Sequence, residues 1–417
     1  MPNCLNCRRR ATGESGGFGR KELTMQRSAK FICQTKNMLM KRAIGIFLSA
    51  ALFIGPACKK AAVPLAKTTS ATGSVNGDSV TVYVAGGIFV QDPVTGKQTL
   101  YAICWKNGVA TPLTPNNWSL ATCVTLSGND VYVGGDMSTA NSFNMATYWK
   151  NGVPVTLTDG STDARITALA INGQDVYAVG WLTAANGFPV ATCWKNGVAE
   201  ELASDSFYSV ANGIAISGND VYVVGQFMNG HGDSSTVVVW KNGVAQSLAG
   251  YPFSYATSVV SSGSDIYLGG TSTSGNGYSN AATVWKDGIL DWAVNYPIIG
   301  QVNSLALNGN DIYAAGIYTE PDGMTTAAWW KNGAQLGLSG RVDSAFVGGI
   351  ALNGQDVYMA GGTGSVNQNN DLALYWKNGV PVTLKNSVVS PLKNGTDSTG
   401  LYANGIAVKS NQVATAD

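Results

Sequence analysis

A four-residue motif, Trp-Lys-Asn/Asp-Gly, occurs seven times in this chain of 417 residues at a nearly constant spacing of 44 to 46 residues. A repeat of this length, made of short β-type segments and tight turns, predicts a propeller, because a four-stranded blade buries both faces only between neighbouring blades. We therefore expect an all-β, seven-bladed β-propeller of four-stranded antiparallel blades. The tryptophans of the motif are Trp105, Trp149, Trp194, Trp240, Trp285, Trp330 and Trp376.

One copy of the repeat divides into four predicted strands. Residues 166–171, 175–179 and 191–194 are predicted as the first three strands, and a fourth ends at Leu202. Asn196-Gly197 joins the last two, and Asn-Gly between two β-prone runs is a strong hairpin signal because both turn positions need positive φ.

The two ends of the repeat region are expected to pair with each other. The second-strand pattern occurs seven times, first around Tyr83, whereas the last first-strand pattern is 404–408, near the C-terminus. Blade 1 would therefore combine strands from both ends of residues 79–417. This pairing would close the ring and leave no unpaired edge between blades.

The charge is unevenly distributed along the chain. Residues 1–58 hold 10 Lys/Arg and 2 Asp/Glu, while the remainder holds 16 Lys/Arg and 23 Asp/Glu, a net charge of −7. A mildly acidic domain lacks the basic surface that a phosphate backbone requires, so we expect no nucleic-acid partner.

The N-terminal part resembles a targeting sequence. In residues 38–58, Lys41-Arg42 precede an apolar run that ends in small residues, which is typical of a secretory signal and too short to span a bilayer. We interpret residues 1–37 as upstream sequence from a misassigned start and residues 59–78 as a flexible tether.

Cys58 has two interpretations. It resembles the lipidated cysteine of bacterial lipoproteins, which would attach the protein to the outer membrane on either its periplasmic or its surface side. Gly55-x-Ala57 also fits ordinary signal-peptidase cleavage. Lipidation is the favoured reading, and the membrane would then be contacted only through the lipid anchor.

The other cysteines fit structural roles. Cys104 and Cys193 immediately precede repeat tryptophans, and Cys123 replaces a small residue found in other copies. Free cysteine packs as a small apolar group, and equivalent positions in separate blades are too far apart for a disulfide. Cys4-x-x-Cys7 lacks a matching second half for a zinc site.

The turns of one predicted face are nearly invariant, and the loops of the other vary. The repeated Asp of the first turn, as in Asp175, is expected to form side-chain-to-backbone hydrogen bonds, and the motif Lys to be a solvated turn residue. Motif Trp and Tyr residues are expected between the blades as core. Variable loops on a repeated scaffold are where recognition is usually found.

Aromatic residues recur where the chain enters the first strand, next to the predicted central channel. They are a candidate ligand-binding ring, because aromatic residues are enriched at binding hot spots; the alternative is that they cap the core. The candidates are Trp118, Arg165, Tyr208, Tyr255, Phe346 and Tyr402, with Phe253 and Gln301 at related positions.

Few residues are available for catalysis. His231 is the only histidine, and Arg165 and Arg341 are the only arginines beyond residue 58. Paired carboxylates for glycoside cleavage would have to be about 5 to 9 Å apart. The candidates are Asp136, Asp163, Asp233, Glu320, Asp322 and Asp371. We predict no catalytic residue, metal or cofactor.

The segment Asp265-Ile-Tyr-Leu-Gly-Gly270, followed by a Trp hairpin, resembles the Kelch-type repeat. Residues 79–417 as a whole are similar to uncharacterised β-propeller lipoproteins of bacterial envelopes. The double glycine is complete in blades 1, 2, 5 and 7 only. Most Kelch-like propellers bind proteins and a minority are enzymes, so the resemblance implies a binding propeller.

Two alternative functions are therefore expected, of which the first is favoured. The first is a monomeric, non-catalytic binding or scaffold module of the bacterial cell envelope, which presents the variable loops of one face to a glycan or protein. The second is a glycoside hydrolase or lyase that acts on polysaccharides through acidic loop residues.

Overall fold

The computed structural model describes residues 79–411 except 93–94, 115–116, 140–141, 204–207, 229–234, 249–252, 274–279, 295–298, 320–322, 339–344, 366–367 and 386–397. The predicted leader, signal, tether and lipidation at Cys58 lie outside these residues and stay predictions. Within the described segments no helix is long and apolar enough to cross a membrane.

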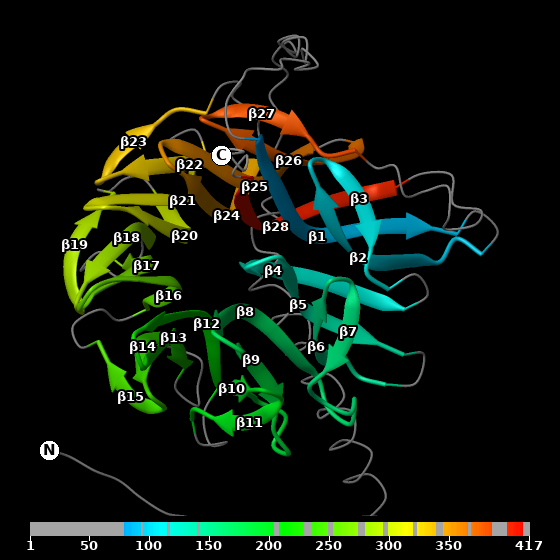
Figure 1. Ribbon diagram of the computed structural model, residues 1–417, viewed down its shortest axis with the longest axis horizontal. Coiled ribbons are helices and arrows are strands. Elements are labelled where there is room, and N and C mark those ends of the chain that lie inside the picture. The colour runs from blue at the N-terminus through cyan, green and yellow to red at the C-terminus, as the bar shows by residue number, and fades with distance from the viewer. Residues whose placement is uncertain are drawn as a thin grey trace, which may run out of the picture. The chain divides into compact units, whose positions relative to one another are not determined.

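The strands form seven four-stranded antiparallel sheets arranged as the blades of a ring, as predicted (Figure 1). The first strand of each blade is innermost in Figure 1. From blade 1 to blade 7 these strands are β28 (Ser398–Asn411), β4 (Trp118–Ser127), β8 (Ala164–Asn172), β12 (Tyr208–Ser217), β16 (Tyr255–Ser262), β20 (Ile299–Asn308) and β24 (Ala345–Asn353).

The other strands follow outward in each blade. The second strands are β1 (Ser79–Gln91), β5 (Asp130–Ser138), β9 (Asp175–Thr183), β13 (Asp220–Met228), β17 (Asp265–Thr273), β21 (Asp311–Thr319) and β25 (Asp356–Ser365). The third strands are β2 (Gln98–Lys106), β6 (Met145–Lys150), β10 (Pro189–Lys195), β14 (Ser235–Lys241), β18 (Asn280–Lys286), β22 (Thr325–Lys331) and β26 (Gln368–Lys377). The fourth strands are β3 (Val109–Pro112), β7 (Val153–Thr156), β11 (Val198–Glu201), β15 (Val244–Ser247), β19 (Ile289–Ala293), β23 (Ala334–Leu336) and β27 (Val380–Thr383).

The ring closes as the sequence predicts. The strand β1 pairs antiparallel with β28, from Ser79 opposite Asn411 to Val90 opposite Ser398. Blade 1 therefore has the order β28-β1-β2-β3 and contains strands from both ends of the domain. Its inner edge is completed by the last strand of the chain.

The motif tryptophans form the core between blades. Each is at most 2% exposed. Trp240 of blade 4 clusters with Tyr177 and Val179 of blade 3, and Trp194 of blade 3 clusters with Tyr132 of blade 2. Each ring thus packs against the preceding blade, which confirms the expected structural role and ties neighbouring blades by apolar burial.

The hairpin Asn, rather than the repeated Asp, bonds to the backbone. Asn196 has φ 50°, and its Oδ1 accepts a hydrogen bond from the Val176 amide at 2.9 Å. Its Nδ2 donates to Oδ1 of Asp175 at 2.7 Å. The repeated Asp was predicted to bond to the backbone, but it bonds to the Asn side chain instead. The reason is that Oδ1 of Asn196 already accepts the hydrogen bond of the Val176 N–H.

The motif Lys is also more constrained than predicted. Lys195 Nζ lies 3.0 Å from Oδ2 of Asp175 and 5.1 Å from the ring centroid of Tyr177. Five other blades repeat this ion pair at 2.7 to 2.9 Å, and all seven repeat the ring contact. Each Lys thus joins its third strand to the second, although its side chain is about half exposed.

The three cysteines of the described residues have free thiols. Burial raises the pKa of Cys104 and Cys123 to about 12 and that of Cys193 to about 11. Such thiols stay protonated and unreactive at neutral pH, in agreement with their prediction as small apolar fillers.

Every first strand contains an extra residue at the same position opposite its second strand, a β-bulge that the sequence did not reveal, and β28 has a second register shift nearer its start. These bulge residues are Thr122, Thr167, Asn212, Thr257, Asn303, Gly348 and Asn404. Six of them donate a side-chain hydrogen bond to the first strand of the next blade, as Thr167 does to the Ala211 carbonyl at 2.7 Å. The bulge therefore turns a polar side chain toward the neighbouring blade.

One glycine in each second strand accommodates the bulge. A Cβ on Gly180 would lie 1.9 Å from the Arg165 carbonyl oxygen, a distance that no side chain tolerates. The equivalent glycines are Gly86, Gly135, Gly225, Gly270, Gly316 and Gly361, each with a similar conflict at 1.7 to 2.1 Å.

The double glycines do not occupy one common register. In blades 2 and 5 the extra glycine precedes this position, and in blades 1 and 7 it follows. The single glycine opposite the bulge is thus the common element, and the Kelch-type resemblance stays a prediction.

Candidate functional site

The six predicted ligand-binding residues all lie near the beginning of first strands, but in two registers. Arg165, Tyr255, Phe346 and Tyr402 stand two positions before the bulge residue of their blade, whereas Trp118 and Tyr208 stand four positions before it. Since strand side chains alternate, all six share the side of the strand that the bulge residue uses. The structure thus places them around the axis on the variable-loop side.

Three aromatic rings gather between blades 1 and 2. Phe89 of β1 contacts Trp118 and Tyr402 edge-on, each with ring centroids 5.8 Å apart. Trp118 is 39% exposed. Phe89 was not among the predicted residues, because it extends β1 beyond the glycine at which that strand was expected to end.

Tyr255 belongs to a chain of hydrogen bonds that crosses blades 5 to 7. Its hydroxyl donates to Oε1 of Gln301 at 2.7 Å, and Gln301 Nε2 donates to Oδ1 of Asn303 at 2.5 Å. Asn303 Nδ2 then donates to the Val347 carbonyl at 2.6 Å. Burial raises the pKa of Tyr255 above its ordinary value. This tyrosine therefore stabilises the ring of first strands, which limits its availability to a ligand.

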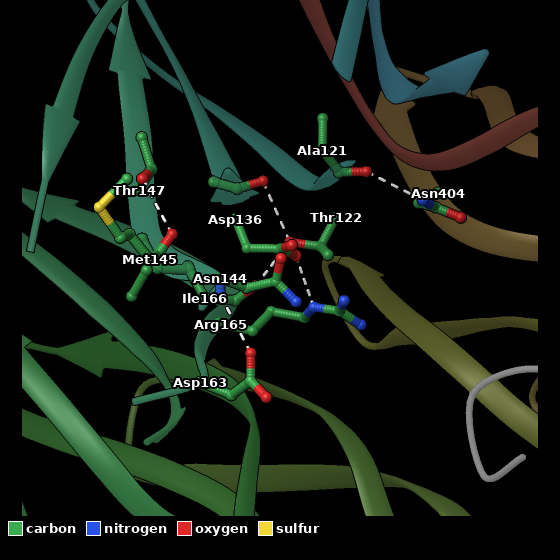
Figure 2. A network of polar contacts seen from close by, with 12 residues as sticks. Ala121, Thr122, Asp136, Asn144, Met145, Thr147, Asp163, Arg165, Ile166 and Asn404 are labelled. Carbon is green, nitrogen blue, oxygen red and sulfur yellow. Dashed lines mark hydrogen bonds and ion pairs between the residues drawn. The ribbon is translucent and has the colours of Figure 1, made fainter. Parts of the chain in front are cut away.

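Arg165 and Asp136 form a buried ion pair between blades 2 and 3. Arg165 Nε donates to Oδ1 of Asp136 at 2.5 Å. The Asp136 side chain is 0% exposed, and that of Arg165 is 22% exposed. Figure 2 shows the carboxylate of Asp136 between Thr122 and Arg165, with the terminal guanidinium nitrogens pointing away from it.

The ion pair leaves hydrogen-bonding groups unused. Oδ2 of Asp136 is buried and has no hydrogen-bond partner among the described residues. Burial raises the pKa of Asp136, the charge of Arg165 opposes this rise, and nearby Asp163 adds to it. The two terminal nitrogens of Arg165 carry the remaining N–H donors of the guanidinium. Asp136 therefore orients Arg165 while leaving its fork available.

Asp163 connects this pair to a loop of blade 2. Its Oδ1 accepts a hydrogen bond from the Asn144 amide at 3.0 Å, and the Asn144 carbonyl accepts one from the Ala164 amide at 2.8 Å. The adjacent Phe143 amide donates to the Gly160 carbonyl at 3.1 Å. The loop before β6 is thus fixed against the segment that enters β8 (Figure 2).

The outcome for the catalytic candidates is mixed. Asp136 is fully buried, and Asp163 is partly exposed. His231, Asp233, Glu320, Asp322 and Arg341 lie outside the described residues, and Asp371 lies in β26 with its side chain undescribed. Within the described part of the chain no three His, Cys, Asp or Glu side chains are grouped to hold a metal ion. The arrangement offers a ligand hydrogen-bond donors, hydrogen-bond acceptors and aromatic faces.

No protein-family model matches the chain, and no curated protein matches it. Among solved structures, a puromycin-hydrolysing peptidase of Mycobacterium tuberculosis is 14% identical with a TM-score of 0.49 over 75% of this chain and 52% of that one. The β-propeller domain of the Trilobed protease of Pyrococcus furiosus is 11% identical, with a TM-score of 0.45 over 73% of this chain and 95% of that domain. A GH43_12 structure from a capybara gut metagenome is 13% identical, with a TM-score of 0.31 over 82% and 67%.

The chain spans about half the length of the first of these peptidases. At these identities and scores, the matches assign no function to the chain.

Proposed function

We propose that the protein is a non-catalytic binding module of the bacterial cell envelope, and that its ligand is a glycan bound at the variable-loop end of the first strands. The observation that carries the proposal is Arg165, held by buried Asp136 with its fork unbonded among the described residues. Exposed aromatic rings at Trp118 and Phe253 lie at the same end.

The chemistry of these groups suits a sugar. Sugar hydroxyls donate and accept hydrogen bonds, which matches the guanidinium donors of Arg165 and the carboxylate acceptors of Asp163. Aromatic rings offer flat apolar faces, which the C–H faces of sugar rings can cover. A few fixed polar groups beside apolar ones are the usual composition of a small-molecule site.

The envelope location rests on residues 38–58, with their signal-like pattern and Cys58. A protein is the alternative ligand for the same surface.

A glycan array with the purified full-length chain tests the proposal. The comparison is with Trp118→Ala, which removes a ring that is 39% exposed, and with Val155→Ala, an equally exposed apolar residue of outer strand β7. We expect binding that Trp118→Ala weakens and Val155→Ala preserves, with unchanged thermal unfolding of both variants. Absence of glycan binding by the wild type, together with capture of a specific envelope protein, would replace the glycan by a protein partner.

A glycoside hydrolase is the second candidate, because Asp163 lies close enough to raise the pKa of Asp136. A raised pKa is what a general acid needs, and glycosidases use paired carboxylates. Full burial of Asp136 argues against direct contact with a substrate. Release of reducing sugar that Asp163→Asn abolishes would favour hydrolysis over simple binding.

A further inference from the structure

Two exposed phenylalanines occupy one repeat position in adjacent blades. Phe143 and Phe188 each stand six residues before the motif Trp of blades 2 and 3, and they are 56% and 36% exposed. The other blades have Thr99, Ser234, Ser279, Met324 and Asn370 at this position in the sequence. Packing of the repeat therefore does not require an aromatic ring here.

The same two blades also depart from the repeat at the axis. Only blade 2 has a carboxylate directly after the glycine opposite the bulge, and only blade 3 has an arginine two positions before the bulge residue. These are the two partners of the buried ion pair, Asp136 and Arg165. Polar and aromatic departures from the common pattern thus fall on one pair of neighbouring blades.

The loops that carry the two phenylalanines are held by hydrogen bonds. The Phe143 amide donates to Gly160, and the next residue, Asn144, donates to Asp163. Phe188 donates from its amide to Oδ1 of Asn186, and its carbonyl accepts a hydrogen bond from the Ala184 amide. Both exposed rings therefore project from loops with defined backbone contacts, which lowers the conformational cost of binding.

We propose that blades 2 and 3 together form an extended binding site for a neutral polysaccharide chain, which runs from Arg165 near the axis outward to Phe143 and Phe188. This proposal rests on the proposed glycan-binding function and specifies its ligand. Arg165 lies on a first strand, whereas Phe188 immediately precedes third strand β10 and Phe143 lies two residues before third strand β6. Two strand spacings of about 4.8 Å separate these levels by roughly 10 Å, so that a ligand touching both must be an oligomer.

The charges favour a neutral polymer over an acidic one. Arg165 contributes one positive charge. Asp136 is bonded to it, and Asp163 lies close enough to Asp136 to affect its pKa, so two carboxyl groups accompany one guanidinium. With both carboxyls ionised the local sum is negative, and with Asp136 protonated it is zero. Neither state attracts an acidic polysaccharide, while neutral hydroxyl groups can bond to both signs of partner.

Binding measured against chain length tests this site. The ligands are a neutral oligosaccharide series drawn from the best array hits, and the proteins are the full-length wild type, Phe143→Ala, Phe188→Ala and the double variant. Leu290→Ala, which truncates a 43% exposed apolar residue of blade 5, is the matched control. We expect wild-type affinity to rise with length, and the double variant to lose about tenfold or more for long members.

The shortest members should bind all variants equally. Equal affinity of the double variant and the wild type at every length would overturn the proposal while leaving glycan binding at the axis intact. If the wild type binds no glycan, the proposed function falls together with the extended site.

Charge supplies a second arm of the experiment. Asp163→Asn removes a negative charge but keeps an Oδ1 that can accept the Asn144 hydrogen bond. We expect the wild type to prefer neutral over acidic polysaccharides and Asp163→Asn to reduce this preference. A wild type that binds acidic chains more tightly would overturn the assignment to a neutral polymer.

Discussion

Arg165 of blade 3 donates from Nε to Oδ1 of Asp136 in blade 2, while Oδ2 of the same carboxylate is buried without a hydrogen-bond partner among the described residues. The pair joins blade 2 to the innermost strand of blade 3, β8. A half-satisfied buried carboxylate is costly to folding, which suggests that its position serves the orientation of Arg165.

Asp136 should make the stability of the protein fall as the pH rises. Its folded pKa is raised above the ordinary 3.8, mainly by burial. The folded state therefore holds this proton at a pH where the unfolded state has released it, and stability declines from about pH 4 until the raised folded pKa is passed. Asp136→Asn should remove this decline. Urea midpoints of both proteins across that range measure it; an identical decline would exclude Asp136 as its source.

The turn aspartates contribute in the opposite direction. The pKa of Asp175 is lowered by hydrogen bonds from Asn196 and Lys195, and the pKa values of four further turn aspartates are lowered by the equivalent Asn and Lys. The pKa of Asp265 in blade 5 is lowered mainly by the hydrogen bond from Lys286. A lowered folded pKa contributes stability above the unfolded value, and this contribution is lost as the pH falls below about 4. The turn aspartates are present in both the wild type and Asp136→Asn. The effect of Asp136 is therefore the difference in stability between these two proteins at each pH.

Gly180→Ala should strongly destabilise the propeller. Its Cβ would lie 1.9 Å from the Arg165 carbonyl oxygen, so that the bulge in β8 or its pairing with β9 must change. We expect a loss of about 3 kcal/mol or more, comparable to overpacking or backbone strain in a core. Gly337→Ala is the control, because nothing lies within 4 Å of its Cβ position. Similar unfolding temperatures for the two variants would contradict the steric argument.

The sequence predicted the architecture because its signals are local and repeated. Asn196-Gly197 predicted a hairpin, and the backbone of Asn196 has the positive φ that this turn requires. The pairing of the first strand of the domain, β1, with its last strand, β28, followed from counting strand patterns in each blade. These signals need only neighbouring residues or a count, so no knowledge of inter-blade distances was necessary.

The site was predicted only in part, because it depends on register between blades. Arg165 was selected by its place before a first strand, but its partner Asp136 lies in the preceding blade and was identified only as one of several carboxylates. The bulge at Thr167 shifts the register of β8 against β9, and the residue at this position differs between blades, being Thr, Asn or Gly. Phe143 and Phe188 could have been found from the sequence, since their common distance to the motif Trp is visible there.

Replacements of Asn196 should separate its two hydrogen bonds. Asn196→Ala loses the bonds to Val176 and Asp175 and places alanine at φ 50°, for an expected cost of about 2 kcal/mol. Asn196→Asp keeps the acceptor for the Val176 amide, as Asp287 does for Ile266 in blade 5 at 2.9 Å. It should therefore cost less than Asn196→Ala. Chemical denaturation ranks the two, and the reverse order would show that repulsion from Asp175 outweighs the retained backbone bond.

Thr167→Val should weaken the contact between blades 3 and 4. The Thr167 Oγ1 lies 2.9 Å from the Val179 carbonyl oxygen and 2.7 Å from the Ala211 carbonyl oxygen, so its one proton can be donated to either. Valine keeps the shape but not the donor. We expect a loss of about 1 kcal/mol in unfolding free energy, the usual net value of such a bond. Thr167→Ser retains the hydroxyl and is the control, because it should lose less than valine does if the hydrogen bonds matter. Equal losses for valine and serine would assign the effect to packing of the methyl group.

The same interaction cannot be added between blades 7 and 1. Gly348 occupies the bulge position of blade 7, and a Cβ there would lie 2.5 Å from the Asn404 carbonyl oxygen. Replacing Gly348 by Thr, which serves as the bulge residue in three other blades, should therefore destabilise the protein instead of completing the ring of hydrogen bonds. Thermal unfolding decides this, since a stabilised Gly348→Thr would mean that β24 and β28 can separate enough to accept the side chain.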